Sequence, residues 1–559
     1  MSLNRVSSLE TLTITHPRRD SHASILHATK LTFNPALEPT MDARTISANT
    51  IPQWKRIAQV VGTVIYCFLA AGVVFGFAAL KPVLKAEGAY HERCSKAVAT
   101  RLSPTSDNGG GSPLDQIDMC VEMRLNIMFT SAAVGTNVAA LPVGAILDRY
   151  GPRNTALFGS VSLAIGSLFL AFAQTIFWAD AYLVGYLFLA LGGPSVFISS
   201  FHLSNAFPSR SGLVLSLLTG AFDASSAMFL GYRVLYERSD GTMGPQNFFL
   251  GYLIVPVYIA LFQLAIMPKE SYQTVGQMVV AKVGEDGDAT PTEEGPNEHT
   301  ALLRGDTLVG GNGGIEGSVE EAMDAKIDAQ KHRVERSDVA GMLHGLSALQ
   351  QMKSLWFALI CLFTVVQMLR LNYFMATVRT QYTFLLHSEE GAEQLNHFFD
   401  IVLPLGGAVA IPFIGHFIDS FSTLAVLSIL VISTTAIGIL GLIPHSMGAG
   451  MANILIFVVY RPFYYTAVSD YCGKVFGFAT FGTVYGTLIC IAGLGNILQN
   501  VLDYIFHKVC HGNPFAINLG LVLVGIVVGI ALVAYVRWGV KRRQNEIGEA
   551  KFCEDDRTV

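Results

Sequence analysis

The stretch GAILDRYGPRN, Gly144–Asn154, ends a long apolar run with an aspartate, two arginines, a glycine and a proline. A weaker copy, GHFIDSF, ends another apolar run further along the chain. Each copy contains a glycine, three residues and an aspartate, which are Gly144 and Asp148 in the first and Gly415 and Asp419 in the second. Recurrence of one signature at corresponding places in two halves indicates a duplicated unit.

The composition of the chain is that of an integral membrane protein. Of its 559 residues, 51% are hydrophobic and only 14% are charged, and the mean hydropathy is +0.45. Globular chains carry about 25% charged residues. The net charge of −5 is scattered, which argues against a nucleic-acid partner. The sequence has no nucleotide-binding loop, nucleophile elbow or Cys/His metal spacing, so we expect no enzyme activity, no cofactor and no metal.

Apolar runs long enough to cross a bilayer, about 20 residues each, occur twelve times. In the first half they cover 58–80, 123–147, 155–174, 180–204, 211–232 and 248–267. In the second half they cover 355–378, 396–419, 423–443, 448–469, 477–502 and 515–537. The two signatures end the second and the eighth runs. We therefore predict an all-α membrane protein with twelve transmembrane helices in two pseudo-symmetric six-helix bundles.

Composition divides the chain into five predicted segments. They are a disordered cytoplasmic N-terminal tail (1–54), an N-terminal six-helix bundle (55–267), a flexible cytoplasmic linker (268–354), a C-terminal six-helix bundle (355–538) and a cytoplasmic C-terminal tail (539–559). The N-terminal tail is polar and lacks the apolar core of a signal peptide. The linker contains GEDGDATPTEEGPNEH and GGNGGIEG, which are typical of flexible segments.

The linker also contains EHTALL, which resembles a dileucine sorting signal for endosomal and vacuolar routing. Glu298, Leu302 and Leu303 are the residues that a sorting adaptor would contact. Short patterns of this kind also arise by chance. We expect a multi-pass protein of the vacuolar membrane, with the plasma membrane as the alternative.

Basic residues in short loops predict the orientation. Those that lie on the predicted cytoplasmic side are Lys55, Arg56, Arg149, Arg153, Arg210, Arg537, Lys541, Arg542 and Arg543. The loop after the first apolar run opposes this orientation with Lys81, Lys85, Arg93, Lys96 and Arg101. We give more weight to the short loops and to the basic C-terminal cluster.

The first signature resembles motif A of the major facilitator superfamily, G-x-L-A-D-R-x-G-R-R. The residues that match are Gly144, Asp148, Arg149, Gly151 and Arg153, whereas Leu147 and Pro152 depart from the motif. The resemblance implies the major facilitator fold, with a binding cavity at mid-membrane between the first, fourth, seventh and tenth helices.

We expect these motif residues, together with Gly415 and Asp419, to act as a gate on the cytoplasmic side of the interface between the two bundles. Gly144 would allow close approach of a neighbouring helix. Asp148 and Arg149 would form charged contacts that stabilise one state of a rocking transporter. The alternative is that they are solvated loop charges.

Two further stretches resemble one particular group within this superfamily. AGVVFGFAALKPVLKAEGAYHERC, Ala71–Cys94, and NAFPSRSGLVLSLLTGAFDASSAMFLGYRVLYE, Asn205–Glu237, resemble the system-L-type large neutral amino acid facilitators and their fungal relatives. That resemblance implies facilitated diffusion or exchange of neutral amino acids by alternating access. The alternatives are proton-coupled symport of another small organic solute, or a membrane sensor that transports nothing.

Two arginines inside predicted helices are candidates for binding a substrate carboxylate. Arg461 lies in VVYRPFYY, one turn before Tyr464. Its alternative role is an ion pair with an acid elsewhere in the bundle. Arg370 lies in QMLRLNYFMATVRTQ beside Tyr373, and the favoured alternative for it is an ion pair with Asp223.

The fourth predicted helix contains GGPSVFISSFHLSN, in which Gly192–Pro194 predicts a break. Ser195, Ser199 and His202 would then share a face that can bind the charged ends of a substrate. The alternative for His202 is an interhelical hydrogen bond.

In the first predicted helix, Gly76 could leave backbone room for a substrate amine, and Phe77 could contact an apolar side chain. Helix packing is the alternative for the glycine. In the fifth, Asp223 lies among small residues and could carry a proton if it were unpaired. Hydrogen bonds to Ser225 and Ser226 are the structural alternative.

Cys94 and Cys120 lie in the loop between the first two predicted helices, which the topology places outside the cytosol. Because that compartment permits disulfides, and because the intervening segment is rich in glycine, we predict a disulfide between them. Cys510 is the alternative partner, and two free thiols are the alternative state.

Overall fold

The computed structural model describes residues 45–46, 50–101, 113–176, 178–239, 241–272, 339, 341–510 and 513–555, which fall in one structural unit. Most of the predicted N-terminal tail and linker lies outside these residues. Glu298, Leu302 and Leu303 also lie outside them, so the sorting signal stays a prediction.

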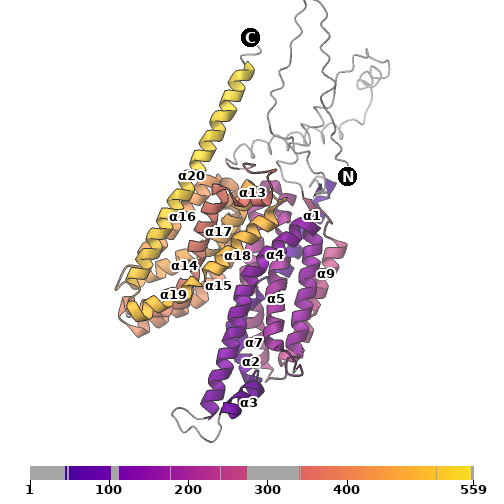
Figure 1. The fold of residues 1–559 in the computed structure, drawn as a ribbon, viewed down its shortest axis with the longest axis vertical. Helices are drawn as coiled ribbons and strands as arrows, with labels where there is room; N and C mark the ends of the chain where they lie inside the picture. The colour runs from indigo at the N-terminus through magenta and orange to yellow at the C-terminus, as the bar shows by residue number, and fades with distance from the viewer. Residues whose placement is uncertain are drawn as a thin grey trace, which may run out of the picture. The chain divides into compact units, whose positions relative to one another are not determined.

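The N-terminal half is a set of helices that lie alongside one another (Figure 1). They are α1 (Gln53–Ala70), η2 (Val73–Gly76), α2 (Phe77–Ala86), α3 (His91–Arg101), α4 (Pro113–Ala171), α5 (Ala181–Ile198), η3 (Phe201–Ala206), η4 (Pro208–Arg210), α6 (Ser211–Ala224), α7 (Ala227–Arg238), α8 (Pro245–Tyr252) and α9 (Ile254–Ala265). The continuous α4 contains two predicted spans, and Gly151 separates them with a positive φ of 82°. Only glycine adopts that backbone conformation without strain.

The C-terminal half repeats this arrangement after the linker. Its helices are α13 (Ala348–Met352), α14 (Leu355–Leu386), α15 (Glu389–Ser420), α16 (Thr423–Leu440), α17 (Met447–Phe476), α18 (Phe481–Gly495), α19 (Leu498–Tyr504), η5 (Ile505–Val509) and α20 (Phe515–Asp555). The last helix runs well past the predicted end of its span at residue 537.

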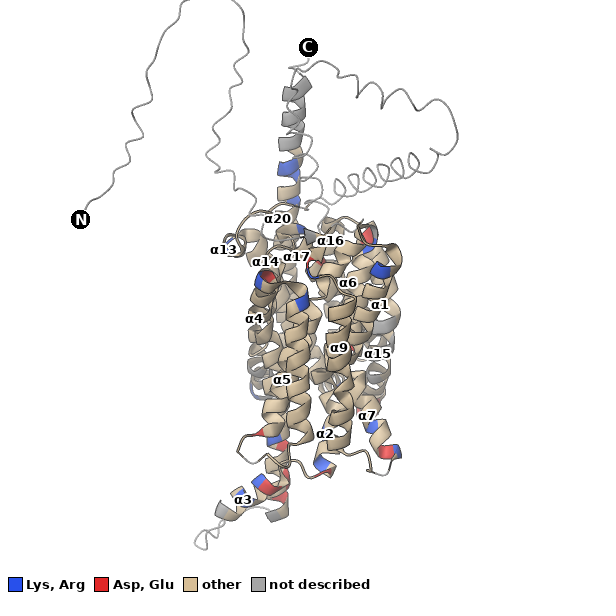
Figure 2. Ribbon diagram, turned by 90° about the vertical axis from the view of Figure 1, so that its right-hand side faces the viewer, with Lys and Arg blue, Asp and Glu red and all other residues tan. Residues whose placement is uncertain are grey.

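Each of the twelve predicted spans falls on helix in the described part of the chain. Eight helices there are long and apolar enough to cross a membrane, and α1 with its continuation would be a ninth, bent by 41°. The other predicted spans lie in the second part of α4, in the apolar end of α15 and in the short helix α18. Lys, Arg, Asp and Glu gather at the two ends of the helices, and the ribbon between these ends is almost free of them (Figure 2).

Only some of the helix breaks were predicted correctly from the sequence. The break predicted at Gly192–Pro194 is wrong, because α5 stays helical through Pro194 and ends at Ile198. The two glycines instead allow close packing. A Cβ on Gly193 would lie 2.3 Å from the Ala71 carbonyl oxygen, and one on Gly192 would lie 2.9 Å from that of Gly159.

Two short strands tie the start of the linker to the N-terminal half. β1 (Thr45–Ile46) pairs in parallel with β2 (Ser271–Tyr272). The Tyr272 hydroxyl donates a hydrogen bond to Gln59 Oε1 at 2.5 Å, which anchors β2 on α1. Burial raises the pKa of Tyr272 above its ordinary value.

Candidate functional site

Asp148 ends the first part of α4 and reaches across to the C-terminal half. Its Oδ1 accepts a hydrogen bond from the Gly482 backbone N–H at 2.8 Å, and its Oδ2 accepts one from that of Thr483 at 2.7 Å. These are the second and third residues of α18, so the carboxylate caps the N-terminus of that helix. A carboxylate there satisfies two free N–H groups and interacts favourably with the helix dipole.

Asp419 makes the same contact in the opposite direction. It lies at the end of α15, and its two oxygens accept hydrogen bonds from Gly212 N–H at 2.8 Å and Leu213 N–H at 3.2 Å. Gly212 and Leu213 are the second and third residues of α6, in the N-terminal half. Each half therefore contributes one aspartate and one helix N-terminus, in a reciprocal pair of caps.

The glycines of the two signatures let the capped helices touch backbone to backbone. A Cβ on Gly144 would lie 1.8 Å from the Gly482 carbonyl oxygen. One on Gly415 would lie 2.5 Å from the Leu213 Cα. Both separations are far below van der Waals contact, so a side chain at either position would push the two halves apart.

The basic residues of the first signature remain within their own half. Arg149 lies over the Tyr150 ring, 5.6 Å from its centroid, so the contact that we expected it to make across the halves is replaced by a local one. The Arg153 guanidinium donates to the Leu264 carbonyl of α9 at 2.5 Å. Of the predicted pair, Asp148 is the residue that joins the halves.

Further along the same helices, an ion pair joins the halves. We call the surface where α4 and α6 meet α15, α17 and α18 the seam. Arg461 of α17 lies 3.4 Å from Asp223 of α6, with the guanidinium Nη2 facing the carboxylate Oδ1. The side chains are 21% and 16% exposed, so the pair is not sealed in the interior. From Gly212 to Asp223 the rise along α6 is about 16 Å, roughly half the hydrocarbon thickness of a bilayer.

Aromatic rings lie on both sides of the seam. In the N-terminal half, Phe222 precedes Asp223 and packs on Phe75 and Phe197, with ring centroids 5.9 Å and 4.7 Å away. Phe201 of η3 contacts Tyr485 of α18 edge to face across the seam, at 5.4 Å.

The seam pair settles which arginine faces Asp223. The structure pairs Asp223 with Arg461, whereas the Arg370 guanidinium donates to Thr434 Oγ1 at 2.7 Å inside the C-terminal half. The alternative that we gave for Arg461, an ion pair with an acid elsewhere in the bundle, is what the structure contains.

Tyr464 and Tyr373 are buried within the C-terminal half. The Tyr464 hydroxyl donates to the Thr364 carbonyl at 3.1 Å. Tyr373 packs with Phe506 and Ile517 in a small apolar cluster. Both side chains therefore contribute to the core of the C-terminal half.

The candidates from the fourth predicted helix do not share a face toward the seam. Ser195 and Ser199 donate to the carbonyls of Leu191 and Val196 in their own helix. His202 Nδ1 lies 2.7 Å from the Ser199 carbonyl, and the ring stacks on Tyr272 of β2. The chain turns into the 3₁₀ helix η3 after Ser199, so side chains there follow three residues per turn rather than 3.6.

The candidates from the first predicted helix pack inside the N-terminal half. A Cβ on Gly76 would lie 2.3 Å from the Ser226 carbonyl oxygen, so this glycine permits close helix packing. Phe77 stacks on Phe129 with ring centroids 5.0 Å apart. The Ser225 hydroxyl accepts from the Gly72 backbone N–H at 2.7 Å, which satisfies a group freed by the bend of α1.

Several seam residues were missed from the sequence. Phe201, Gly482, Thr483, Tyr485 and Gly486 all lie at contacts between the halves. A Cβ on Gly486 would lie 2.2 Å from the Ala140 carbonyl oxygen. The spacing of Gly482 and Gly486, four residues apart on one helix face, is the signal that could have identified the contact.

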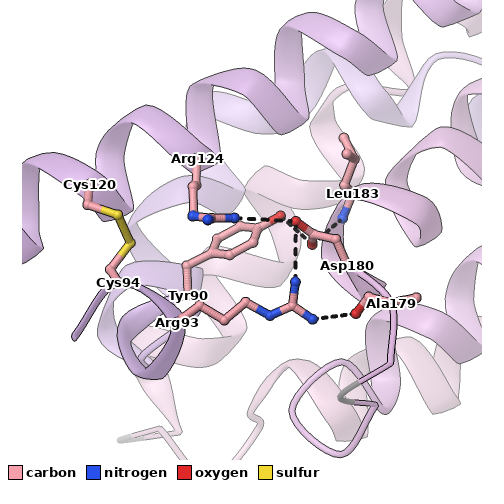
Figure 3. Close-up of polar contacts among 8 residues, drawn as sticks. All are labelled: Tyr90, Arg93, Cys94, Cys120, Arg124, Ala179, Asp180 and Leu183. Carbon is pink, nitrogen blue, oxygen red and sulfur yellow. Dashed lines mark hydrogen bonds and ion pairs between the residues drawn. A yellow bond between two sulfur atoms is a disulfide. The ribbon is translucent and has the colours of Figure 1, made fainter. Parts of the chain in front are cut away.

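A polar cluster holds the opposite end of the N-terminal half (Figure 3). Cys94 of α3 and Cys120 of α4 form a disulfide. Beside it, the Tyr90 hydroxyl donates to Asp180 Oδ1 at 2.8 Å, while Arg93 and Arg124 lie 3.7 Å and 3.8 Å from Asp180 Oδ2. Burial, with a smaller contribution from the Asp180 carboxylate, raises the pKa of Tyr90 above its ordinary value.

Basic residues of the loop after the first apolar run pair with acids at this end of the protein. Arg93 faces Asp180, and Lys81 and Lys85 lie 3.1 Å and 3.5 Å from Glu122 and Asp118.

The chain has the fold of known transporters. It aligns with the MFS proton:xylose symporter XylE at a TM-score of 0.51 and 14% identity, over 86% of this chain and 96% of that one. The all-α architecture, the apolar helices and the reciprocal caps agree with that likeness. The chain is an integral membrane protein with the major facilitator fold.

Sequence comparison then gives the family. A comparison with the profiles of known protein families finds no match. The chain belongs to the family of Protein FMP42 of Saccharomyces cerevisiae, with which it is 46% identical over 505 residues, 86% of this chain and 95% of that protein.

Two relatives match over a shorter region. Equilibrative nucleobase transporter 1 of Bos taurus is 29% identical over 186 residues, 33% of this chain and 36% of that protein. Large neutral amino acids transporter small subunit 3 of Homo sapiens is 31% identical over 173 residues, 30% of this chain and 29% of that protein.

Proposed function

We propose that this transporter moves neutral amino acids by alternating access, through facilitated diffusion or exchange. The observation that carries the proposal is the ion pair between Asp223 and Arg461, which joins the halves across the seam, about 16 Å along α6 from the capped Gly212. A zwitterion carries the two charges that complement this pair, so it can bind there without leaving an unpaired charge in the membrane.

The chemistry of the two groups gives a binding mode. Arg461 presents a planar fork of N–H donors, which suits a carboxylate. Asp223 presents acceptor oxygens to an ammonium group. The neighbouring Phe222, Phe75 and Phe197 supply apolar surface for the side chain of a neutral amino acid.

The reciprocal caps supply the gate. Asp148 and Asp419 hold the first part of α4 and the end of α15 on the helix N-termini of the opposite half, on the side that we predict to be cytoplasmic. Their release would let that side open, and their formation would close it. A substrate that replaces the Asp223–Arg461 contact with its own charges would weaken one link between the halves and so favour the change of state.

The names of the relatives support a small organic substrate and suggest a second candidate. The human relative is a large neutral amino acids transporter, and the bovine relative is a nucleobase transporter of similar identity. A nucleobase would use the aromatic rings at the seam, Phe201 and Tyr485, rather than the charges. Proton-coupled symport of a small organic solute and a membrane sensor that transports nothing are the two remaining candidates.

The test is uptake into liposomes that contain the purified protein. Labelled leucine, phenylalanine, arginine, adenine and glucose would be compared with empty liposomes, with and without a pH gradient. We expect leucine and phenylalanine to enter, independently of the gradient. Entry of adenine alone would favour the nucleobase transporter, gradient-driven accumulation would favour symport, and no entry of any solute would favour the sensor.

We also propose the vacuolar membrane as the location, with the plasma membrane as the alternative. The support is the acidic dileucine pattern at Glu298, Leu302 and Leu303, which lies outside the described residues. A fluorescent fusion should mark the vacuolar membrane, and alanine at both leucines should redirect it. An unchanged location would remove the sorting adaptor as a partner.

A further inference from the structure

A second polar site lies away from the seam, inside the C-terminal half. It is a cavity between α14, α16, α17 and α20. Its polar lining includes Gln367, Arg370, Thr434, Asn453, Tyr460 and Asn518. Of these four helices, α17 also contributes to the seam, together with α15 and α18.

The hydrogen bonds around Arg370 run in one direction. The guanidinium donates to Thr434 Oγ1 at 2.7 Å, and that hydroxyl donates to Gln367 Oε1 at 2.7 Å. The amide Nε2 of Gln367 then remains a donor without a partner among the described residues. Both Gln367 and Arg370 line the cavity.

The charge of Arg370 is not balanced by an acid. No carboxylate of the described side chains lies within ion-pair distance of its guanidinium, and the cavity lining contains no Asp or Glu. Uncompensated charges inside a membrane protein are costly and acquire a partner. Among the described side chains, the Arg370 guanidinium is hydrogen-bonded to the Thr434 hydroxyl and not to a carboxylate.

Two neighbours of Arg370 offer further unused donors. Gln367 is 1% exposed and Tyr460 is 2% exposed. Gln367 Nε2 lacks a partner among the described residues, and the Tyr460 hydroxyl, which lies near Thr434, makes no hydrogen bond of normal geometry there. Buried polar atoms rarely remain unpaired. Asn453 Oδ1 is an unpaired acceptor on the same helix as Tyr460, but it lies seven residues earlier, about 10 Å along α17.

Glycine keeps the space around the guanidinium open. A Cβ on Gly438 of α16 would lie 2.7 Å from Arg370 Nη2. One on Gly525 of α20 would lie 3.6 Å from Gln367 Nε2. These helices approach the donors closely without a side chain between them.

We propose that Arg370, Gln367 and Tyr460 bind a small monovalent anion. Chloride and the carboxylate of a small organic solute share the chemistry that these donors recognise. Such an anion would neutralise Arg370 and link α14 to α17. Because Tyr460 precedes Arg461 directly, occupation of this site would also affect the helix that forms the seam pair, but the binding itself does not depend on the substrate of the transporter.

The test is the thermal stability of the purified protein in different sodium salts at equal ionic strength. Gluconate serves as the bulky reference anion, and chloride or acetate is added in its place. We expect a saturable rise in Tm of roughly 2 °C or more, because a ligand that binds only the folded state stabilises it. A rise with chloride alone identifies an inorganic ion, whereas a rise with acetate identifies a carboxylate.

Three variants make this test specific. Arg370→Gln should abolish the dependence on chloride and acetate, and Gly438→Ala should weaken it by crowding the guanidinium. Arg379→Gln, which removes an exposed arginine of the same helix, should behave as the wild type. Removal of an unbalanced charge should leave Arg370→Gln folded in gluconate. The proposal would be overturned by a wild-type Tm that is the same in all salts, or by an unchanged dependence in both cavity variants.

Discussion

Asp148 and Asp419 occupy equivalent positions in the two halves of the protein, and each caps a helix that belongs to the other half. Asp148 accepts from the second and third N–H groups of α18, and Asp419 accepts from those of α6. The duplicated signature therefore corresponds to a duplicated contact. Under the proposed alternating access, both caps would form or break together as the halves rock, as a gate requires.

The first prediction concerns these caps. Asp148→Asn should slow flux in liposomes and leave equilibrium substrate binding within several-fold of the wild type. Asparagine carries no charge and has one carbonyl oxygen in place of two, so we expect the closed seam to lose about 1–3 kcal/mol. Flux and binding would be measured on the same preparation.

Asp419→Asn should have an effect of the same sign, because its contact is equivalent. Glu237→Gln, which alters an exposed acid at the end of α7, serves as the control and should keep wild-type flux. Loss of binding by Asp148→Asn in a correctly folded protein would argue that this residue contacts substrate instead of gating.

A second prediction follows from the backbone contact of the capped helices. Gly144→Ala places a methyl group 1.8 Å from the Gly482 carbonyl oxygen, so the seam should no longer close on that side. A cysteine placed at the seam should then react faster with a membrane-impermeant thiol reagent added from the cytoplasmic side. Gly231→Ala is the matched control, since a Cβ there meets no atom within 4 Å. Equal reactivity in both variants would show that the seam tolerates the methyl group.

The third prediction concerns the disulfide between Cys94 and Cys120. Their separation of 26 residues corresponds to a stabilisation of roughly 3–4 kcal/mol on chain-entropy grounds. Serine at either position should therefore lower Tm, whereas Cys510→Ser should not. Peptide mapping without reduction should recover the cross-linked pair. Free thiols at both positions in protein from its native membrane would contradict the pairing and weaken the predicted orientation.

A fourth prediction uses the end of the linker. Residues 341–352 pack on the ends of α17 and α18, where Gly341 N–H donates to the Lys474 carbonyl and Thr480 donates to Gln351. Burial, assisted by the charge of Arg543, lowers the pKa of His344 below its ordinary value. The undocked segment therefore binds more protons than the docked one, so docking should weaken as the pH falls through about 6.5 and below.

Hydrogen exchange of residues 341–352 measures this docking. Protection should fall between pH 7.5 and 5.5 after correction for intrinsic exchange rates. His344→Asn should remove the pH dependence, and His416→Asn should preserve it. A dependence that survives the loss of His344 would assign it to another group.

The helices and the two capping acids could be predicted from the sequence because both are local patterns. Apolar length identifies a span, and the repeated glycine–aspartate spacing identified Asp148 and Asp419. What these acids contact could not be predicted, since each partner is a backbone N–H group in the opposite half of the chain. Backbone donors at helix starts carry no side-chain signal of their own.

The membrane interior was predicted less well. Asp223, Arg370 and Arg461 were all recognised as unusual, yet the favoured pairing of Asp223 with Arg370 differs from the observed pair. Helical spacing tells which residues share a face, but tertiary packing decides which way that face points. The helix face predicted for His202 is wrong for a related reason, because the chain leaves α-helical geometry at Ser199.

The most direct test of the account is equilibrium binding of leucine and two analogues, each of which lacks one of its charges. If the proposed pair binds substrate, Arg461→Lys should weaken the binding of leucine, because the bidentate guanidinium fork is lost while the positive charge remains. 3-Methylbutylamine, which has no carboxylate, should bind the wild type poorly and be insensitive to this substitution. 4-Methylpentanoate, which has no ammonium group, should be insensitive to Asp223→Asn. An equal loss of affinity for all three ligands in both variants would contradict the account and assign Asp223 and Arg461 a purely structural role.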